Sequence, residues 1–468
     1  MAKKTFTRAD VRNYADGFIK FLNKAVSPIH AVEVCRDWLM SAGFEELGDG
    51  SVWQLNPLGK YFVIKNGTAL IAFVLGSHFK PGRPVYMVGT HVDSPCLRLK
   101  PKPKSCCKNW QQLSVSTYGG GLWRTWFDRD LSVCGRFFVK EHGRIRVQLI
   151  HSRQPMLYIP SLAIHLDRDS NNSFSFNAED ALQPIFAAGD PQLTWKRKES
   201  DENGSNDCSN KNVDFIAEIG KACGLNAADI VDFELYLCGS QPATVGGMMG
   251  DFIFGARLDN LISTYAALSG FVEAANTSDM LQASDHVMVF AAFDNEEVGS
   301  QSAPGAASAW TEGVLRRIQN DAQDQCAFER SMTKSFLLSA DVSHAVHPNY
   351  RSKHDENHTP LFHNGPVLKV NHNQRYATNG YSATKVKRVA EIADVPLQEY
   401  TNRNDMPCGS TIGPILSTRL GIETADIGNA VLAMHSIREM ASTIDLFHAY
   451  RLFKTYFEKF PHVCGEFL

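Results

Sequence analysis

The sequence predicts an α/β fold: a main domain with a mixed, largely parallel central sheet flanked by helices, interrupted by an inserted β-rich domain. Three strand-like apolar runs lie at residues 85–90, 286–293 and 336–341. Apolar residues at helical spacing mark both ends of the chain. Between about residues 98 and 238 the pattern changes to period-two alternation broken by glycine and proline, which predicts the insert.

The domain limits follow from these changes of pattern. The chain has 468 residues, more than a single typical domain. Residues 1–97 and 239–468 are expected to form the main domain, and residues 98–238 the insert. Within the insert, residues 196–212 are almost wholly polar, which predicts an exposed or disordered loop.

Capping signals define the two terminal helices. Thr7 and Asp10 resemble a capping pair ahead of an apolar stripe that begins at Val11. Ser442 and Asp445 stand in the same relation to a second, aromatic-rich stripe. This second stripe is expected to pack on the core.

The whole-chain composition excludes several classes of partner. The net charge of −3, with both signs mixed, shows no footprint of a nucleic-acid or membrane-surface protein. No apolar run approaches the ~18 residues of a membrane helix, and the N-terminus lacks an apolar signal core. The 11 cysteines are scattered without a Cys-x-x-Cys pair, which favours a reducing compartment. The protein is therefore expected in the cytosol, without a nucleic-acid or membrane partner.

Adjacent carboxylates, Glu296 and Glu297, follow the apolar run 286–293. Inside a strand, neighbouring side chains point to opposite faces, so the two can serve one site only where the strand ends and the backbone turns. Burying such a pair requires a cation or a bound proton, which points to a metal. The alternative is a solvated loop after the strand.

Four further candidate ligands, one of them followed by Asp93, lie elsewhere in the chain. His91 follows the run 85–90 and can offer a metal a neutral imidazole nitrogen, while Asp93, two residues on, can orient the ring. Asp259 precedes a helical pattern, Asp341 closes the run 336–341, and His435 lies near the C-terminus. Each has an ordinary alternative, such as a helix cap for Asp259.

The combination of these residues is more informative than any one of them. An open α/β sheet binds ligands at the carboxyl ends of its strands, where several of them fall. Nitrogen and oxygen ligands without sulfur suit a catalytic pair of zinc-like ions better than a structural zinc. Such pairs, bridged by a carboxylate, recur in aminopeptidases.

Several long strings of residues resemble the M18 metallopeptidases, and among them the aspartyl aminopeptidases. They occur in the family order and span nearly the whole chain: 89–95, 159–166, 257–260, 293–300, 341–350, 402–414 and 434–439. The resemblance implies that the main domain is catalytic and that the insert is a dimerisation domain.

Carried over residue by residue, the resemblance implies two divalent metal ions, zinc first, with cobalt or manganese also compatible. Asp259 would bridge them. His91 and Asp341 would complete one ion, and Glu297 and His435 the other.

The resemblance makes Glu296 the general base, taking a proton from the water that the metals activate and passing it to the leaving amine. Asp93 is expected to be a catalytic residue together with Glu296. Related dinuclear peptidases also suggest a cis peptide bond after Asp259.

The implied substrates are peptides with an unblocked N-terminal Asp or Glu. His165, His344, Lys369 and Tyr376 would contact them, with Lys369 the partner of the acidic side chain, although a lone lysine is usually a surface residue. The family further implies a tetrahedral dodecamer built from dimers, in which His165 reaches a neighbouring subunit's site.

Two other functions stay open from the residues alone. A carboxypeptidase or an N-acyl amino-acid deacylase can share the metal constellation. The other is a non-enzymatic scaffold whose metals are structural.

Overall fold

The computed structural model of the chain describes residues 6–107, 110–188 and 214–467. The polar segment 196–212 lies outside the described residues. The chain forms two compact units, Met1–Ser94 with Ala243–Leu468, and Pro95–Pro242. These boundaries differ by a few residues from the predicted domain limits.

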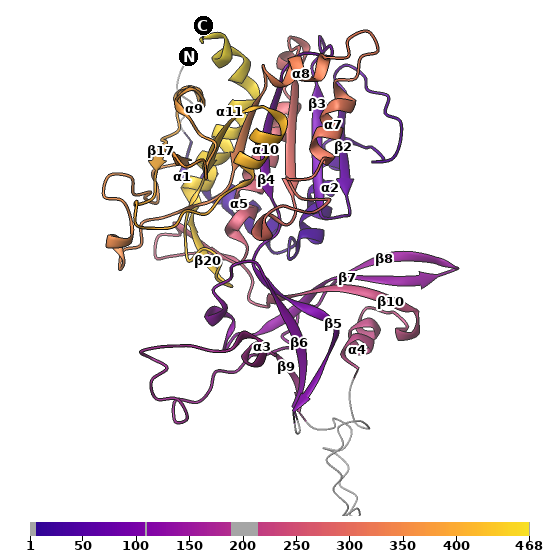
Figure 1. The fold of residues 1–468 in the computed structure, drawn as a ribbon, viewed down its shortest axis with the longest axis vertical. Coiled ribbons are helices and arrows are strands. Elements are labelled where there is room, and N and C mark those ends of the chain that lie inside the picture. Colours follow the sequence, from indigo (N-terminus) through magenta and orange to yellow (C-terminus); the bar gives the residue numbers. More distant parts are fainter. Residues whose placement is uncertain (1–5, 108–109, 189–213, 468) are drawn as a thin grey trace, which may run out of the picture. The chain divides into compact units, whose positions relative to one another are not determined.

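The first unit is built on a nine-stranded mixed sheet (Figure 1). Its central strands β13, β4, β14 and β18 pair in parallel, whereas β2, β3 and β16 join through antiparallel pairs. Short strands β1 and β17 pair in parallel at the edges. In sheet order the strands are β1 (Glu45–Glu46), β2 (Lys60–Lys65), β3 (Ala69–Leu75), β13 (Val287–Phe293), β4 (Val85–His91), β14 (Phe336–Ala340), β18 (Glu423–Gly428), β16 (Val367–Lys369) and β17 (Gln398–Tyr400).

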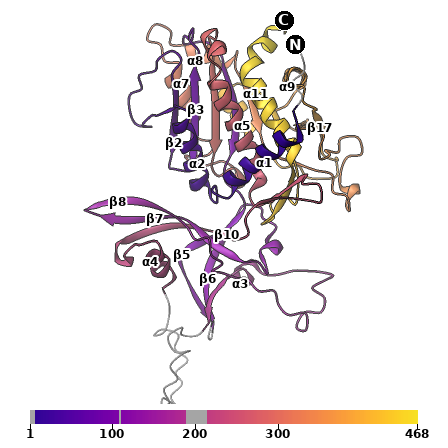
Figure 2. The same cartoon turned by 180° about the vertical axis from the view of Figure 1, so that it is seen from behind.

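Helices cover both faces of this sheet, because successive residues of the central strands are apolar on both sides. One core holds α1 (Arg8–Leu22), α2 (Pro28–Ser41), α5 (Leu258–Ala275), α9 (Gly380–Ala393) and α11 (Thr443–Gly465), most of which face the viewer in Figure 2. The other core holds α7 (Trp310–Ile318), α8 (Ala327–Met332) and α10 (Ile412–Leu420), in front of the sheet in Figure 1. The predicted α/β class is confirmed.

The predicted helix caps are present in the structure. Thr7 and Asp10 form a reciprocal capping box at α1. The Ser442 side chain accepts a hydrogen bond from the Asp445 backbone N–H at the start of α11, whose apolar stripe packs in the core as expected.

A second, five-stranded sheet in the same unit carries loops of the candidate site. Its order is β11 (Thr244–Gly246), β12 (Phe252–Gly255), β20 (Glu439–Ser442), β19 (Ala430–Leu432) and β15 (Ser343–His344). The remaining short elements of the unit are α6 (Ser278–Gln282), η4 (Glu296–Val298) and η5 (Arg351–Lys353).

The second unit is β-rich. Its six strands pair antiparallel in the order β8 (Arg144–His151), β7 (Leu131–Glu141), β10 (Ile230–Gly239), β5 (Cys96–Cys107), β6 (Trp110–Tyr118) and β9 (Ile185–Ala188). Short helices accompany them, η1 (Trp123–Trp126), α3 (Ala178–Ala181), α4 (Phe215–Ala222) and η3 (Ala227–Asp229). A role of this unit in dimer formation stays a prediction.

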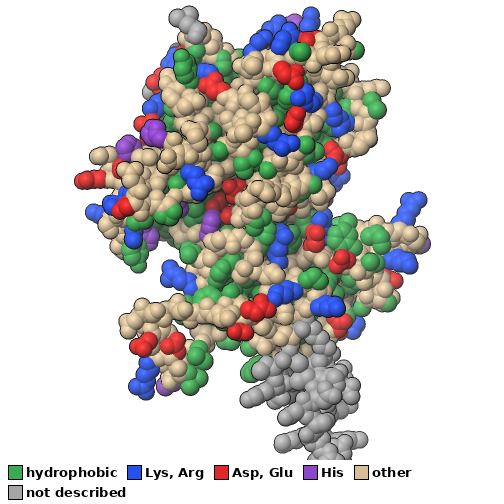
Figure 3. All heavy atoms as spheres, in the orientation of Figure 1, with side chains coloured by type: hydrophobic (Ala, Val, Ile, Leu, Met, Phe, Trp, Pro, Cys, Tyr) green, Lys and Arg blue, Asp and Glu red, His purple; other side chains and the backbone are tan. Residues whose placement is uncertain are grey.

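Surface charge agrees with the composition. Basic and acidic side chains intermingle on the face shown in Figure 3. Among the described residues, no helix has the length and apolar character needed to cross a membrane.

Candidate metal centre

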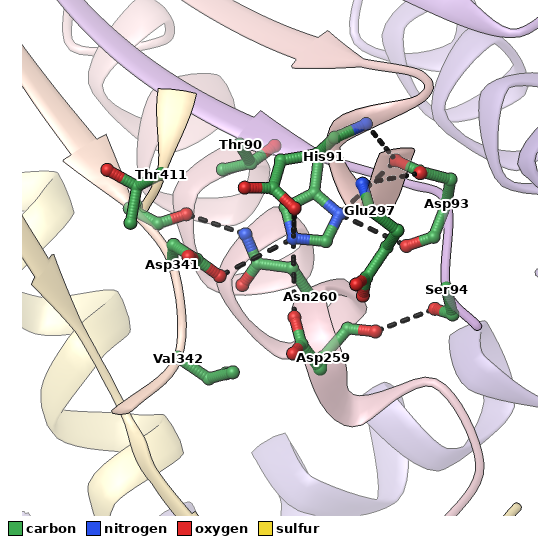
Figure 4. A network of polar contacts seen from close by, with 12 residues as sticks. Thr90, His91, Asp93, Ser94, Asp259, Asn260, Glu297, Asp341, Val342 and Thr411 are labelled. Atoms are coloured by element: carbon green, nitrogen blue, oxygen red, sulfur yellow. Dashed lines mark hydrogen bonds and ion pairs between the residues drawn. The ribbon is translucent and has the colours of Figure 1, made fainter. Parts of the chain in front are cut away.

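Five predicted ligands come together at one edge of the nine-stranded sheet. Figure 4 labels His91, Asp259, Glu297 and Asp341 among them. His91 is the last residue of β4, and Asp341 directly follows β14. Glu297 lies in η4 beyond β13, Asp259 in the first turn of α5, and His435 between β19 and β20. Because β4, β13 and β14 run parallel, their carboxyl ends meet at this edge.

Possible ligand atoms form three groups, of which two share Asp259 and the third joins His91 to Glu296 and Glu297. His91 Nε2 lies 3.2 Å from Asp259 Oδ1 and 3.4 Å from Asp341 Oδ1, and we call these three residues the first group. His435 Nε2 lies 3.2 Å from Asp259 Oδ2 and 3.3 Å from Glu297 Oε2, which together form the second group. Each carboxylate oxygen of Asp259 therefore faces a different group.

Both groups fit a zinc ion. Ligands ~2.0–2.2 Å from a tetrahedral zinc lie about 3.3 Å from one another, and the four nitrogen-to-oxygen distances between 3.2 and 3.4 Å match this spacing. Within the described residues, the buried Glu297 Oε1 has no hydrogen-bond partner. A bound cation would satisfy such an oxygen.

Asp93 connects the imidazole of His91 to both glutamates. Its backbone carbonyl lies 3.1 Å from His91 Nδ1, and its carboxylate Oδ1 lies 3.4 Å from the same nitrogen. The two carboxylate oxygens accept the backbone N–H groups of Glu296 and Glu297, each at 3.1 Å. With Nδ1 engaged, Nε2 is the nitrogen that faces Asp259, ready for a proton or a metal.

Burial and crowded negative charge shift the pKa values of the centre. The pKa of Glu296 is raised to about 8, chiefly by burial and also by the neighbouring carboxylates, against the opposing effect of His91. Burial also raises the pKa of Glu297 well above its usual value. For His91, burial lowers the pKa, but Asp259 and Asp341 raise it more, so the net shift is well upward. A divalent cation would relieve this concentration of acidic groups.

The ordinary alternatives for these residues do not match the structure. The side chains of Glu296 and Glu297 are 15% and 5% exposed, so they are not part of a solvated loop. Asp259 does not act as a helix cap, because its carboxylate oxygens face His91 and His435. The peptide bond between Asp259 and Asn260 is cis, as expected.

The predicted substrate residues are placed differently from one another. Lys369 is 1% exposed: its ammonium donates to the Val342 carbonyl at 2.8 Å and lies 3.4 Å from Asp341 Oδ2. The alternative of a surface lysine is therefore wrong. The Lys369 Nζ also lies 5.0 Å from the centre of the Tyr376 ring. His344 lies exposed in β15, and His165 in an exposed turn of the second unit.

One residue of the centre received no role from the sequence. Glu439, at the start of β20, is 3% exposed and accepts the backbone N–H of His435 at 2.9 Å and that of Asp259 at 3.1 Å. Burial, followed by the charge of Asp259, raises its pKa to about 8. The sequence sign of a role for Glu439 was a carboxylate as the first residue of an otherwise weakly polar strand.

Comparisons with known proteins agree on one family. A family model described as aminopeptidase I zinc metalloprotease (M18) matches residues 21–457. An aspartyl aminopeptidase of Caenorhabditis elegans is 47% identical over 98% of this chain and 97% of that protein.

Solved structures agree as well. A cryo-EM structure of the Ape4 and Nbr1 complex has a TM-score of 0.92 at 40% identity, covering 98% of this chain and 88% of that chain. The S. cerevisiae mApe1 dodecamer has a TM-score of 0.84 at 27% identity, covering 98% of this chain and 99% of that chain.

Proposed function

Because the chain belongs to the M18 family of zinc metalloproteases and is a metallo-aminopeptidase, we propose that it removes an unblocked N-terminal Asp or Glu from peptides. The observation that carries the proposal is the bridging position of Asp259 between two ligand groups, with a further glutamate beside them. Paired metal sites of this kind recur in aminopeptidases.

The chain's residues would hold two ions, one in each group. Zinc is the first candidate, since the family consists of zinc metalloproteases, and cobalt or manganese would suit the same nitrogen and oxygen ligands. When bound, the pair would polarise the scissile carbonyl and lower the pKa of a water molecule.

Glu296 would act as the general base. Its Oε2 lies 3.9 Å from His91 Nε2, farther than the oxygens of Asp259 and Asp341, so this carboxylate stands beside the first group rather than within it. Asp93 fixes its backbone N–H and so aims the side chain. Glu296 would take the proton of the attacking water and deliver it to the leaving amine.

Lys369 would recognise the acidic side chain of the substrate. An ammonium carries three N–H donors, and two of them are accounted for by the Val342 carbonyl and Asp341. The third would contact the substrate carboxylate, with His344 and Tyr376 lining the same region. The same ammonium would also hold Asp341 in place for the first group.

We further infer a homo-oligomer of dimers that forms a tetrahedral dodecamer, since a structural relative is a dodecamer. The second unit would form the dimer and carry His165 to a neighbouring subunit's site. Mixing a His165→Ala subunit with a Glu296→Gln subunit should restore activity, because some sites then combine an intact base with a donated histidine. Absence of restoration in mixed oligomers would assign His165 to its own chain.

The cellular location proposed for this enzyme is the cytosol. The scattered cysteines show no disulfide framework in the sequence, which favours a reducing compartment.

A substrate panel tests the function. Peptides that differ only in the first residue, Asp, Glu, Leu or N-acetyl-Asp, would be incubated with enzyme stripped by a chelator and then reloaded with zinc, cobalt or manganese. We expect metal-dependent release of Asp and Glu, little release of Leu, and no cleavage of the acetylated peptide. Removal of the C-terminal residue would indicate a carboxypeptidase, loss of the acetyl group a deacylase, and no turnover with any metal a scaffold.

A further inference from the structure

We propose that Glu439 is a positioning residue for the second metal ion, holding the backbones of Asp259 and His435 so that their side chains converge. The inference rests on the proposed function only in assuming that the second group binds a metal. It concerns a residue that contacts ligands and not the reacting atoms.

The carboxylate of Glu439 joins two segments that are far apart in the sequence. Its Oε2 accepts the N–H of Asp259 at 3.1 Å, and its Oε1 accepts the N–H of His435 at 2.9 Å. The side chain is 3% exposed, so water does not compete for these bonds. One buried group thereby sets the separation of two ligand backbones.

The sheet explains why this position can serve both segments. Strand β20 lies between β12 and β19 in the five-stranded sheet, and Glu439 pairs with Gly255 at the end of β12. The chain continues from β12 to Asp259, and from β19 to His435. Glu439 therefore lies between the two strands from which both ligand segments leave the five-stranded sheet.

Both ligand segments lack the support of regular secondary structure. His435 has a φ of 65° and Ala433 a φ of 57°, left-handed values that cost energy in residues other than glycine. Asp259 has non-helical φ and ψ angles although it lies in α5. Their buried N–H groups need acceptors, and a carboxylate supplies two on one side chain.

Of the two residues that Glu439 contacts, His435 belongs to the second group alone and Asp259 to both groups. In the first group, Asp341 donates its backbone N–H to the Ile427 carbonyl at 2.8 Å, and His91 is part of strand β4. Loss of the Glu439 carboxylate should therefore weaken one ion and leave the other nearly unchanged, although Asp259 serves both. A purely structural carboxylate would show no such preference.

Glu439→Gln is the direct test. Glutamine has nearly the same shape but one acceptor oxygen and an NH₂ donor, so one of the two backbone N–H groups loses its acceptor and faces a donor. We expect the second ion to bind 10–100-fold more weakly, the range typical for residues that support metal ligands. Added zinc should raise the activity of the variant toward the wild-type value, because all direct ligands remain.

Asp445→Asn is the matched control. Asp445 is also buried and accepts two backbone N–H groups, of His363 at 2.7 Å and of Gly365 at 2.8 Å, and it belongs to neither ligand group. This variant should lose thermal stability through the same amide mismatch yet keep both zinc affinities. Zinc content would be measured on folded oligomer after dialysis against graded chelator.

The outcomes separate the inference from the proposed function. Wild-type protein that binds fewer than two zinc ions per subunit would contradict the dinuclear centre. Two ions in the wild type and unchanged affinities in Glu439→Gln would overturn the positioning role alone. If Glu439→Gln does not fold, Glu439→Asp keeps both acceptors but retracts them by one methylene, and wild-type affinity for the second ion in that variant would equally overturn it.

Discussion

The two ligand groups of the proposed metal centre share Asp259 but are held in different ways. In the first group, His91 and Asp341 stand at the ends of central parallel strands, and their side chains are 1% and 12% exposed. In the second group, Glu297 lies in the short helix η4 and His435 in a loop, where the histidine side chain is 30% exposed. Regular sheet positions one half, and hydrogen-bonded loops position the other.

Two carboxylates compensate for the missing regularity of the second group. Asp93 accepts the N–H groups of Glu296 and Glu297, and Glu439 accepts those of Asp259 and His435. Each carboxylate therefore links the backbones of two residues of the proposed centre. Because loops open locally at lower free energy than a central sheet, we expect the second ion to exchange faster than the first.

Asp259→Ala should abolish metal binding in both ligand groups. Each oxygen of Asp259 faces a different group, so both lose a ligand and the two histidines lose their buried partner. We expect loss of both ions and of all measurable activity, checked by zinc content and peptide hydrolysis on folded protein. Retention of two ions at wild-type affinity would show that Asp259 is not the bridge.

The two ligand groups can be disrupted one at a time. His435→Ala should disrupt the second group, and His91→Ala the first. His435→Ala is expected to keep one slowly dissociating zinc ion, because the buried first group stays complete, and to lose nearly all activity. His91→Ala removes a 1% exposed ligand and should disturb the centre more deeply. Zinc release into a chromogenic chelator would give both rates.

The wild-type enzyme supplies the control for this pair. Its release should show two phases, with the slow phase matching the ion that remains in His435→Ala. A single phase, or faster loss from His435→Ala than from His91→Ala, would contradict the asymmetry.

Glu296→Gln should leave both ligand groups intact and remove only the proposed general base. We expect two zinc ions and a KM near the wild-type value, with kcat lower by ~10²–10⁴-fold, the scale of general acid–base catalysis. The measurement is kcat and KM for an N-terminal Asp peptide alongside zinc content. Wild-type turnover would remove Glu296 from the mechanism.

The sequence predicted the regular half of the centre better than the irregular half. Apolar runs ending in His91 and Asp341 marked strands whose carboxyl ends meet, as β4 and β14 do. The pairing of β13 with β4 then accounts for the nearness of η4. Period and composition predicted these strands because buried parallel strands leave a strong apolar signal.

Tertiary packing decides what the sequence left open. The two N–H groups that Glu439 joins belong to residues far apart in the chain, so no local pattern reveals the link. Lys369 is buried because the short strand β16 pairs with β18 and brings its ammonium to Asp341. The division of labour between Glu296 and Glu297 came from family resemblance, since spacing treats the two alike.

The smallest expected effect is a release of protons when zinc binds. In the metal-free protein, burial raises the pKa of Glu296 to about 8, burial raises that of Glu297, and carboxylate neighbours outweigh burial to raise that of His91. Near neutral pH these groups hold protons that zinc displaces, so binding should release protons and tighten as pH rises. The release should fall once pH exceeds the raised pKa values, because the groups are then already deprotonated.

Titration calorimetry in buffers of different ionisation enthalpy would measure the effect between ~pH 6.5 and ~pH 8.5, around the raised pKa of Glu296. Glu296→Gln should bind both ions while releasing up to about one proton fewer near neutral pH, since only that carboxyl is lost. Glu297→Gln should also reduce the release, but with loss of the second ion, because Glu297 is a proposed ligand of that ion. Equal proton release in wild type and Glu296→Gln at every pH would show that Glu296 does not lose a proton when zinc binds.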